Sequence, residues 1–302
     1  MTSLMILLAS VVTAEPELAW KETSHSLALM RNSQIVWQFN YKPEEGKPYF
    51  HPITIGGGDP VTDLRPADHY WHRAIWFSWK SINGLVYWEE NPQTGKSPGE
   101  TEVITVKAAP RDDHSAQFEL VLHYHPPGRP AVLTERRLVT VSAPTAAGSY
   151  HIDWLSTFTA GDADVLLDRT PIAGEPNGVS WGGYAGLSLR LAPELRPWQF
   201  SDSEGAVKEV TKQARWIAFS GPTQGGGTAA IIVLDHPHSF RHPTPWYLIQ
   251  GMPYFSPAVL YRSPHTLPAK GNLTLKYRII FQAEAVDREA VEREWQAFAA
   301  GR

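Results

Sequence analysis

Glycine and proline interrupt this chain so often that long helices cannot run through it. The sequence holds 23 glycines and 25 prolines among 302 residues, and many of them cluster as turn signals, as at 56–60, 126–130 and 181–186. The intervening segments alternate β-branched and aromatic residues with polar ones at a period of two, which is typical of strands. At least nine such segments predict an all-β fold.

We expect these strands to form a large antiparallel β-sandwich of the jelly-roll or super-sandwich type, because many short strands at modest spacing favour packed sheets. One helix is predicted near the C-terminus. Asp287 can cap it, Val291, Trp295 and Phe298 fall on one face, and Gly301 can end it. No linker marks a boundary, so 15–302 is expected to be a single β-sandwich domain.

The first fourteen residues form an apolar stretch that ends in the small-residue pattern Val12-Thr13-Ala14. This pattern indicates a cleaved signal peptide over 1–14 and a periplasmic or extracellular protein, while a buried first strand is the alternative. No other segment approaches the ~18 apolar residues of a membrane helix, so no integral membrane segment is expected.

Composition narrows the classes of partner. The net charge is −4 with both signs interspersed, so no basic stripe is available for nucleic acid. The absence of cysteine excludes disulfides, thiolate metal sites and a cysteine nucleophile. Twelve tryptophans and eleven tyrosines suit either core packing or stacking on sugar rings. The oligomeric state stays open.

A polar and aromatic cluster lies in the segment 65–73, directly before the apolar strand AIWFSW. Asp68, His69 and His72 belong to this Pro-flanked loop, and loops on a rigid scaffold often carry binding or catalysis. Histidine titrates near neutrality and serves as general acid, general base or metal ligand. Backbone hydrogen bonding at a sheet edge is the alternative role for these imidazoles.

Strand alternation places other ionisable groups. In the segment 150–158, Ile152, Trp154 and Phe158 share one face, so His151 and Asp153 point together to the other. Glu89 and Glu90 close the predicted strand LVYWEE, so they point in opposite directions and cannot act as a pair of carboxylates.

The segment 235–246 is a second polar and aromatic cluster, which follows the apolar strand AAIIVL. We hypothesise that this loop and the 65–73 loop meet at one end of the sandwich and form one site with several imidazoles, an arginine and stacking tryptophans.

These patterns give two sets of candidate residues. The catalytic candidates, as acid/base or metal-binding groups, are His69, His72, His151, Asp153 and His242. The substrate-binding candidates are His51, Trp71, Arg73, Trp76, Glu89, Arg241 and Trp246. No cofactor is required for chemistry on a bare sugar ring, although the imidazoles could hold a divalent metal.

One spacing suggests a different chemistry. His151-Ile152-Asp153 has the H-x-D spacing of the two-histidine, one-carboxylate iron site. The third ligand would come from His236, His238 or His242. A metal-dependent oxygenase is therefore an alternative hypothesis.

The stretch from His51 to Glu90 resembles the bacterial PmoA-like, or methane oxygenase-like, family of unknown function, with supporting matches in DHPHSFRHPTPWYL and AKGNLTLKYRIIFQ. The resemblance covers most of the chain after the N-terminus. It implies a carbohydrate setting, because members are common in bacteria that degrade polysaccharides, and it supplies no catalytic residues.

The leading hypothesis is an exported hydrolase, lyase or epimerase that acts on a saccharide or sugar derivative. A non-catalytic saccharide-binding module is the second, and the metal-dependent oxygenase is the third.

Overall fold

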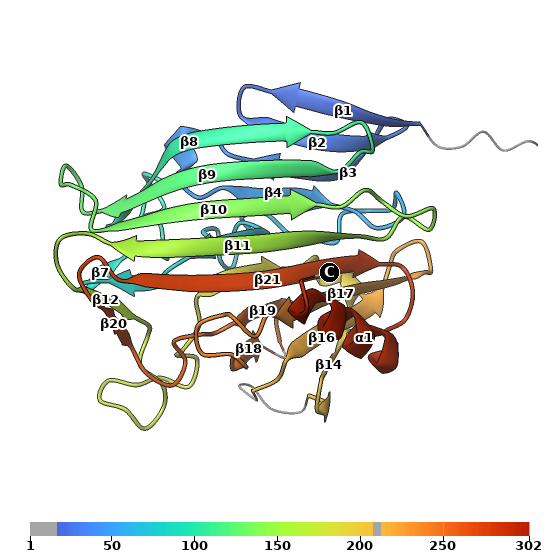
Figure 1. Ribbon diagram of the computed structural model, residues 1–302. Helices are drawn as coiled ribbons and strands as arrows, with labels where there is room; N and C mark the ends of the chain where they lie inside the picture. Colours follow the sequence, from blue (N-terminus) through green and yellow to red (C-terminus); the bar gives the residue numbers. More distant parts are fainter. Residues whose placement is uncertain (1–16, 208–212, 250, 302) are drawn as a thin grey trace, which may run out of the picture.

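Two large antiparallel sheets pack face to face and form the body of the protein (Figure 1). The structure is a computed structural model that describes residues 17–207, 213–249 and 251–301. The first sheet has eight strands in the order β1-β2-β3-β4-β5-β13-β19-β18. They span Leu18–Thr23 (β1), Ser26–Arg31 (β2), Gln34–Asn40 (β3), Tyr49–Ile53 (β4), Ile75–Ser78 (β5), Gly186–Arg190 (β13), Tyr254–Pro257 (β19) and Trp246–Ile249 (β18).

The second sheet has nine strands in the order β15-β14-β16-β17-β21-β11-β10-β9-β8. They span Gly205–Ala206 (β15), Gln199–Asp202 (β14), Trp216–Pro222 (β16), Thr228–Asp235 (β17), Asn272–Gln282 (β21), Tyr150–Ala160 (β11), Leu133–Val141 (β10), Ala116–His125 (β9) and Glu100–Pro110 (β8).

A small third sheet of four strands has the order β20-β12-β6-β7. Its strands span His265–Leu267 (β20), Val165–Asp168 (β12), Ser81–Ile82 (β6) and Leu85–Val86 (β7). Two short 3-10 helices cover Pro43–Glu45 and Pro193–Leu195.

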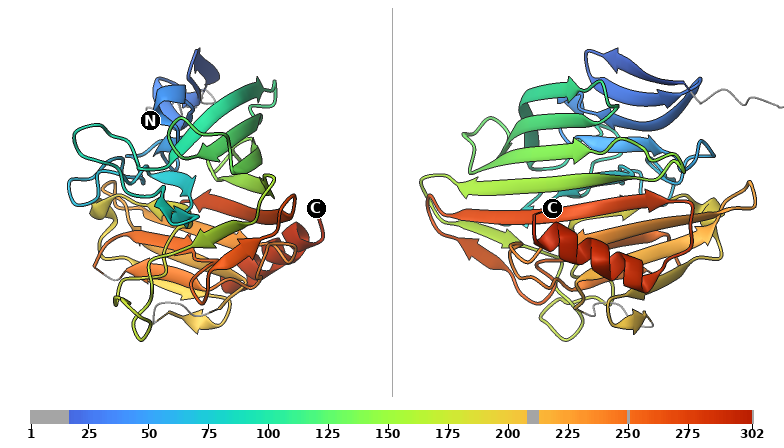
Figure 2. Two further views of the ribbon diagram at one scale, coloured as in Figure 1. Left: turned by 90° about the vertical axis from the view of Figure 1, so that its left-hand side faces the viewer. Right: turned by 45° about the vertical axis from the view of Figure 1, so that its right-hand side comes forward.

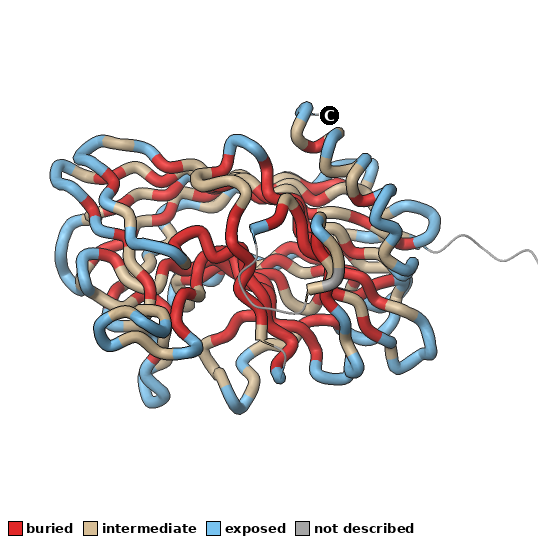
Figure 3. The backbone as a smooth tube through the Cα atoms, turned by 90° about the horizontal axis from the view of Figure 1, so that it is seen from below, coloured by how far each residue is buried: buried red, intermediate tan, exposed pale blue. Residues whose placement is uncertain are grey.

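The main core lies between the two large sheets. Phe39 of the eight-stranded sheet meets Phe118 of the nine-stranded sheet with ring centroids 4.7 Å apart. Figure 3 shows the buried positions running along the strands and the exposed ones gathered in the turns at the rim. The predicted faces of 150–158 are confirmed, because Ile152, Trp154 and Phe158 are buried in this core.

The helix α1 (Arg288–Ala299) lies against the outer face of the nine-stranded sheet (Figure 2). The Asp287 carboxylate accepts hydrogen bonds from the backbone N–H groups of Glu289 and Ala290, as the predicted cap requires. Val291 and Phe298 are buried against the sheet. The predicted all-β sandwich with one C-terminal helix is confirmed.

The sequence also predicts a signal peptide and no integral membrane segment. The predicted signal peptide over 1–14 lies outside the described residues. Among the residues that are described, no helix has the length and apolar character needed to cross a bilayer.

A charged pair is buried inside the main core. Glu135 and Arg137 point to the same side of β10, and both side chains are almost wholly inaccessible to solvent. The Glu135 carboxylate accepts two hydrogen bonds from Arg137, at 2.7 and 2.9 Å, and one each from the hydroxyls of Tyr124 and Ser156. The Arg137 guanidinium also stacks over Trp154, 4.6 Å from the ring centroid. These contacts replace the water that both charges lose on burial.

Replacing Glu135 with leucine should lower the free energy of unfolding by about 3–5 kcal/mol, because the Arg137 charge would stay buried without its partner. Urea unfolding followed by tryptophan fluorescence measures the change. The E135L/R137M double variant should recover part of the loss, since two apolar side chains need no pairing. A double variant as unstable as the sum of the two single variants would contradict this account. D162N is the control, because it breaks an exposed pair with Lys270 and should have little effect.

Candidate functional site

An aromatic pocket lies on the outer face of the eight-stranded sheet, away from the main core. Side-chain alternation builds its floor: in β5, Phe77 points into the core and Trp76 points outward, and in β18, Trp246 points inward and Tyr247 outward. Tyr254 of β19 also points outward and joins the same second cluster of buried aromatic residues.

The pocket encloses about 410 Å³, which is within the range of small-molecule sites. Its wall is made mostly of flat aromatic rings and two aliphatic side chains. These residues are Trp71, Trp88, Trp181, Tyr184, Tyr247, Tyr254, Ile249 and Met252. Three further lining residues carry the chemistry of the site, namely His69, His72 and Glu89.

Two tight turns hold the imidazoles at the pocket. The backbone N–H of His69 donates to the carbonyl of Pro66, and that of His72 donates to the carbonyl of His69. The chain then closes on itself, because the N–H of Arg65 donates to the carbonyl of His72. This short loop presents His69, Trp71 and His72 together, as the sequence predicts.

His72 lies in a stack of rings and makes no hydrogen bond through its side chain to any described residue. Its ring centroid is 4.7 Å from that of His69 and 5.1 Å from that of Tyr254, with both interplanar angles at 29°. Its Nδ1 atom and the Nε1 atom of Trp71 are buried and lack a partner among the described residues. Buried polar atoms are almost always satisfied, so two unpartnered nitrogens on neighbouring residues of one pocket are unusual.

His69 is paired with a carboxylate at the pocket edge. Its Nδ1 atom lies 3.1 Å from Oδ2 of Asp68, close enough for charge attraction although the ring N–H is poorly aligned for a hydrogen bond. Arg190 donates to both oxygens of Asp68, at 2.8 and 2.9 Å. Burial by itself raises the pKa of Asp68, but the contacts with Arg190 and His69 outweigh it and hold the pKa below its ordinary value.

Glu89 enters the pocket from the segment after β7. Its Oε1 atom accepts hydrogen bonds from the Lys80 amine and, at 2.9 Å, from the Tyr184 hydroxyl. Burial raises the pKa of Tyr184, so that hydroxyl stays protonated and remains a donor. The predicted strand through Glu90 is wrong beyond Val86, because Trp88 and Glu89 are neighbours and yet both line the pocket.

Glu90 points away from the pocket into a buried network of charges. Its carboxylate accepts hydrogen bonds from Lys47 at 3.2 Å, from Arg65 at 3.3 Å and from Arg73 at 2.9 and 3.1 Å. Arg73 also donates to Glu45 at 2.8 Å. Arg73 is therefore fully used behind the pocket, and the expectation that it orients a substrate is corrected.

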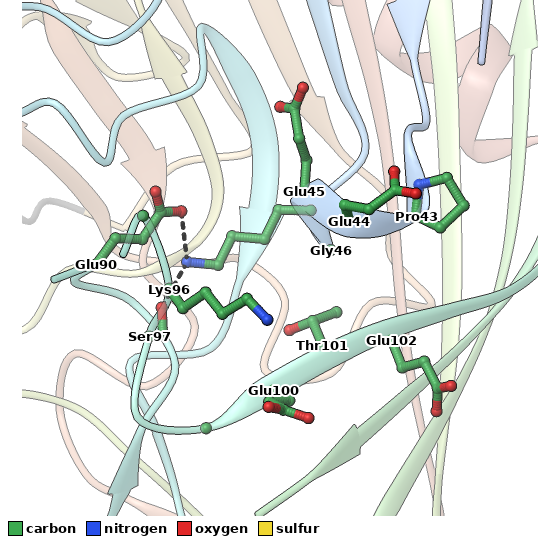
Figure 4. A pocket seen from close by; sticks show the side chains of 13 residues that line it. Pro43, Glu44, Glu45, Gly46, Glu90, Lys96, Ser97, Glu100, Thr101 and Glu102 are labelled. Atoms are coloured by element: carbon green, nitrogen blue, oxygen red, sulfur yellow. Dashed lines mark hydrogen bonds and ion pairs between the residues drawn. The ribbon is translucent and has the colours of Figure 1, made fainter. Parts of the chain in front are cut away.

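A small hollow of about 160 Å³ adjoins this network. Figure 4 shows Glu90 and Ser97 beside it. The amine of Lys47 donates hydrogen bonds to both side chains, at 3.2 and 2.9 Å. Burial lowers the pKa of Lys47 to about 8, against the opposing effect of Glu90. The amine has three partners, Glu90, Ser97 and the carbonyl of Trp88, so its hydrogen-bonding capacity is exhausted.

The second predicted cluster lies on the other side of the molecule. His242 stacks on Trp295 of α1 at 6.1 Å and bonds to the buried Asp235, and His236 packs on Phe298 of the same helix. The hypothesis that the two loops share one site is wrong. The main core separates them, because β17 leads the second loop to the outer face of the nine-stranded sheet.

Three other candidates have structural partners outside the pocket. Arg241 donates to the carbonyls of Val259, Ser263 and Pro264. Trp246 is buried in the main core, and its Nε1 atom donates to a backbone carbonyl. His51 bonds to the Thr62 hydroxyl at 3.0 Å, and burial lowers its pKa to about 4. Trp76 lies beneath the pocket, 5.1 Å from the ring of His72.

His151 and Asp153 share the outer face of the nine-stranded sheet, as predicted, but Asp153 is held by Arg278 through bonds of 2.6 and 2.8 Å. Within the described ranges, no three His, Asp or Glu side chains lie close enough together to hold a metal ion. The oxygenase hypothesis therefore lacks a third ligand in the described part of the chain.

Several pocket residues were missed by the sequence reasoning. Tyr184, Tyr247 and Tyr254 come from distant segments that only strand pairing unites. Tyr247 could have been predicted, because neighbouring residues of a strand point to opposite faces of the sheet, so Trp246 and Tyr247 cannot both point into the core. Trp181 belongs to a segment that reads as a turn.

The chain was compared with solved structures and with curated proteins. Several solved structures align with this chain, among them two at 9% identity. The alpha-galactosidase from Lactobacillus brevis has a TM-score of 0.42 and is matched over 92% of this chain and 41% of its own. The Slr1438 protein from Synechocystis sp. PCC 6803 has a TM-score of 0.38, over 92% of this chain and 100% of its own. At these scores the matches assign neither a function nor site residues. No curated protein matches the sequence.

The family assignment made from the motifs needs correction. The family model that matches is the family of unknown function DUF6807, over residues 26–296, and nothing points to a PmoA-like family. This match covers most of the sequence, and the chain therefore belongs to the DUF6807 family of unknown function.

Proposed function

We propose that this protein binds a saccharide or sugar derivative in the aromatic pocket and acts on it by proton transfer. One observation carries the proposal: a cavity walled by aromatic rings is lined by His72 and Trp71, whose Nδ1 and Nε1 atoms are buried and lack a hydrogen-bond partner among the described residues. A sugar offers the matching surfaces, because its C–H faces pack on aromatic rings while its hydroxyls meet isolated polar groups.

The set of ionisable groups favours an epimerase or a lyase over a hydrolase. Glycosidic hydrolysis ordinarily needs two carboxylates that flank the bond, and Glu89 is the one carboxylate among the described residues that line the pocket. Epimerisation and elimination need one base and one acid. Glu89 and His69 line the same cavity and supply that combination.

We assign the roles by the partners of each group. Glu89 takes the proton from a carbon next to a carbonyl group of the sugar derivative, and the electron pair of that C–H bond moves to the carbonyl oxygen. His69, with Asp68 beside it, delivers a proton to the opposite face or to a leaving oxygen. His72 is a neutral hydrogen-bonding group in this scheme, because burial, with His69 and Arg190 nearby, lowers its pKa to about 2.

Binding without turnover is the second candidate, and one observation favours it. The Lys80 amine and the Tyr184 hydroxyl already donate to the Oε1 atom of Glu89, so one of the two carboxylate oxygens is occupied by the protein itself. In that case the aromatic wall supplies affinity and Glu89 is an acceptor for a sugar hydroxyl.

Export remains part of the proposal on sequence grounds alone. A signal peptide over 1–14 would deliver the protein to the periplasm or the exterior, where extracellular saccharides are met.

Deuterium exchange distinguishes the two candidates. Sugars and uronic acids incubated with the protein in D₂O should lose a carbon-bound proton signal in the proton NMR spectrum if the pocket abstracts protons. E89Q and H69Q should each slow the exchange by about 10²–10⁴-fold. E119Q, on the outer face of β9, is the control and should exchange at the wild-type rate. Line broadening of a sugar without any exchange would instead establish the binding module.

The neutral state of His72 predicts acid sensitivity. The folded pKa is about 2 and the ordinary value is 6.5, so below pH 6.5 the unfolded chain binds a proton that the folded chain does not. The unfolding free energy of wild type should therefore fall, relative to that of H72Q, by up to about 1.4 kcal/mol per pH unit on acidification below pH 6.

Urea unfolding of both proteins between pH 7 and pH 4.5 measures this difference. H25Q, at an exposed turn between β1 and β2, is the control for loss of an imidazole outside the pocket. Parallel pH profiles of wild type and H72Q would show that His72 is not held neutral.

A further inference from the structure

One large aromatic side chain at the pocket stays open to solvent. Trp181 lines the pocket, yet 55% of its surface is exposed, more than for any other large hydrophobic residue in the described part of the chain. The other exposed large hydrophobics, Ile104 and Leu166, belong to β8 and β12. Trp181 is therefore an isolated ring at the pocket mouth, which suits a small ligand better than a protein interface, because protein interfaces need contiguous apolar area.

The loop that carries Trp181 is fixed by its backbone. The Tyr247 hydroxyl donates to the carbonyl of Trp181 at 2.9 Å, and the N–H of Gly183 donates to the carbonyl of Thr170 at 2.9 Å. A Cβ atom at Gly183 would lie 2.2 Å from the ring of Tyr261, so the chain passes where no side chain fits.

A carboxylate fixes the N-terminal end of the loop. Glu175 accepts a hydrogen bond from the backbone N–H of Ile172 at 2.8 Å and pairs with the buried Arg169. The fold thus fixes both ends of the loop that carries the exposed indole. An apolar ring left in water contributes no hydrophobic free energy to folding, so this exposure does not stabilise the fold.

The ring continues the aromatic wall outward. Its centroid is 6.2 Å from that of Tyr184, with an interplanar angle of 30°, and Tyr184 is 5.4 Å from Trp88 inside the pocket. Trp181, Tyr184 and Trp88 therefore form a line of rings that leads from the cavity to the solvent.

We propose that Trp181 is the platform of a second sugar subsite, so that the ligand is an oligosaccharide or a glycoside with at least two rings. This inference rests on the proposed function, because the first ring occupies the pocket. The second ring stacks on the exposed indole outside it, and further rings extend into solvent.

Calorimetric titration with saccharides of different length tests the proposal. The probes are glucose, galactose and xylose, and the β-1,4-linked dimers to tetramers of each. W181A should weaken binding of the dimers and longer chains by about threefold to tenfold more than it weakens monosaccharide binding, which is typical of one lost aromatic stack, because the first ring meets Trp181 only at the pocket mouth. W181F should restore most of the affinity.

Two further variants separate the outcomes. W71A, inside the pocket, should weaken monosaccharides and oligosaccharides alike, and L166A, on β12, should weaken neither. Equal losses for all lengths in W181A, or no loss for any, would overturn the second subsite while W71A still supports the saccharide pocket. A wild-type protein that binds no probe of any length would overturn both proposals. Thermal unfolding of each variant confirms that it is folded.

Discussion

The two-residue period of the eight-stranded sheet is the constraint on which the rest of the structure depends. Each strand beneath the pocket must fill the main core with one face and the pocket with the other. Trp246 and Tyr247 are neighbours in sequence, yet one is sealed in the core and the other contacts the pocket. A shift of one residue in register would exchange them, so the packing that stabilises the sandwich also fixes the floor of the pocket.

Buried charge makes the back of the pocket rigid. Glu90 is held by three cations, Lys47 and the two arginines at the ends of the 65–73 loop, and loss of Glu90 would leave the buried Lys47 amine without its charge partner. Arg73 follows His72 directly, and Glu90 follows Glu89, so the network joins the two segments that carry the imidazoles and the carboxylate. A polar cluster outside the pocket thus sets the separation of the imidazoles and the carboxylate that line it.

Local features were predictable and distant pairings were not. The cap at Asp287 and the faces of 150–158 follow from local rules, and the structure has both. The 65–73 loop was recognised because its residues are close in sequence. The meeting of that loop with 235–246 was predicted wrongly, because it depends on which sheet β17 joins, and β17 pairs with β16 and β21 through contacts that no local pattern encodes. Tyr184 and Tyr254 were not predicted as pocket residues for the same reason.

The charges around the pocket are balanced in pairs, and this balance bears on the kind of ligand. Asp68 is matched by Arg190 and Glu89 by Lys80, while His72 is held neutral by burial. A charged ligand would compete with these pairs, whereas an uncharged one with many hydroxyls can use the spare lone pairs of Glu89 without breaking its pair with Lys80. Neutral sugars meet that requirement. A uronic acid would have to compete with Glu89 for the Lys80 amine, so under the proposed function a neutral sugar should bind more tightly than its uronic acid.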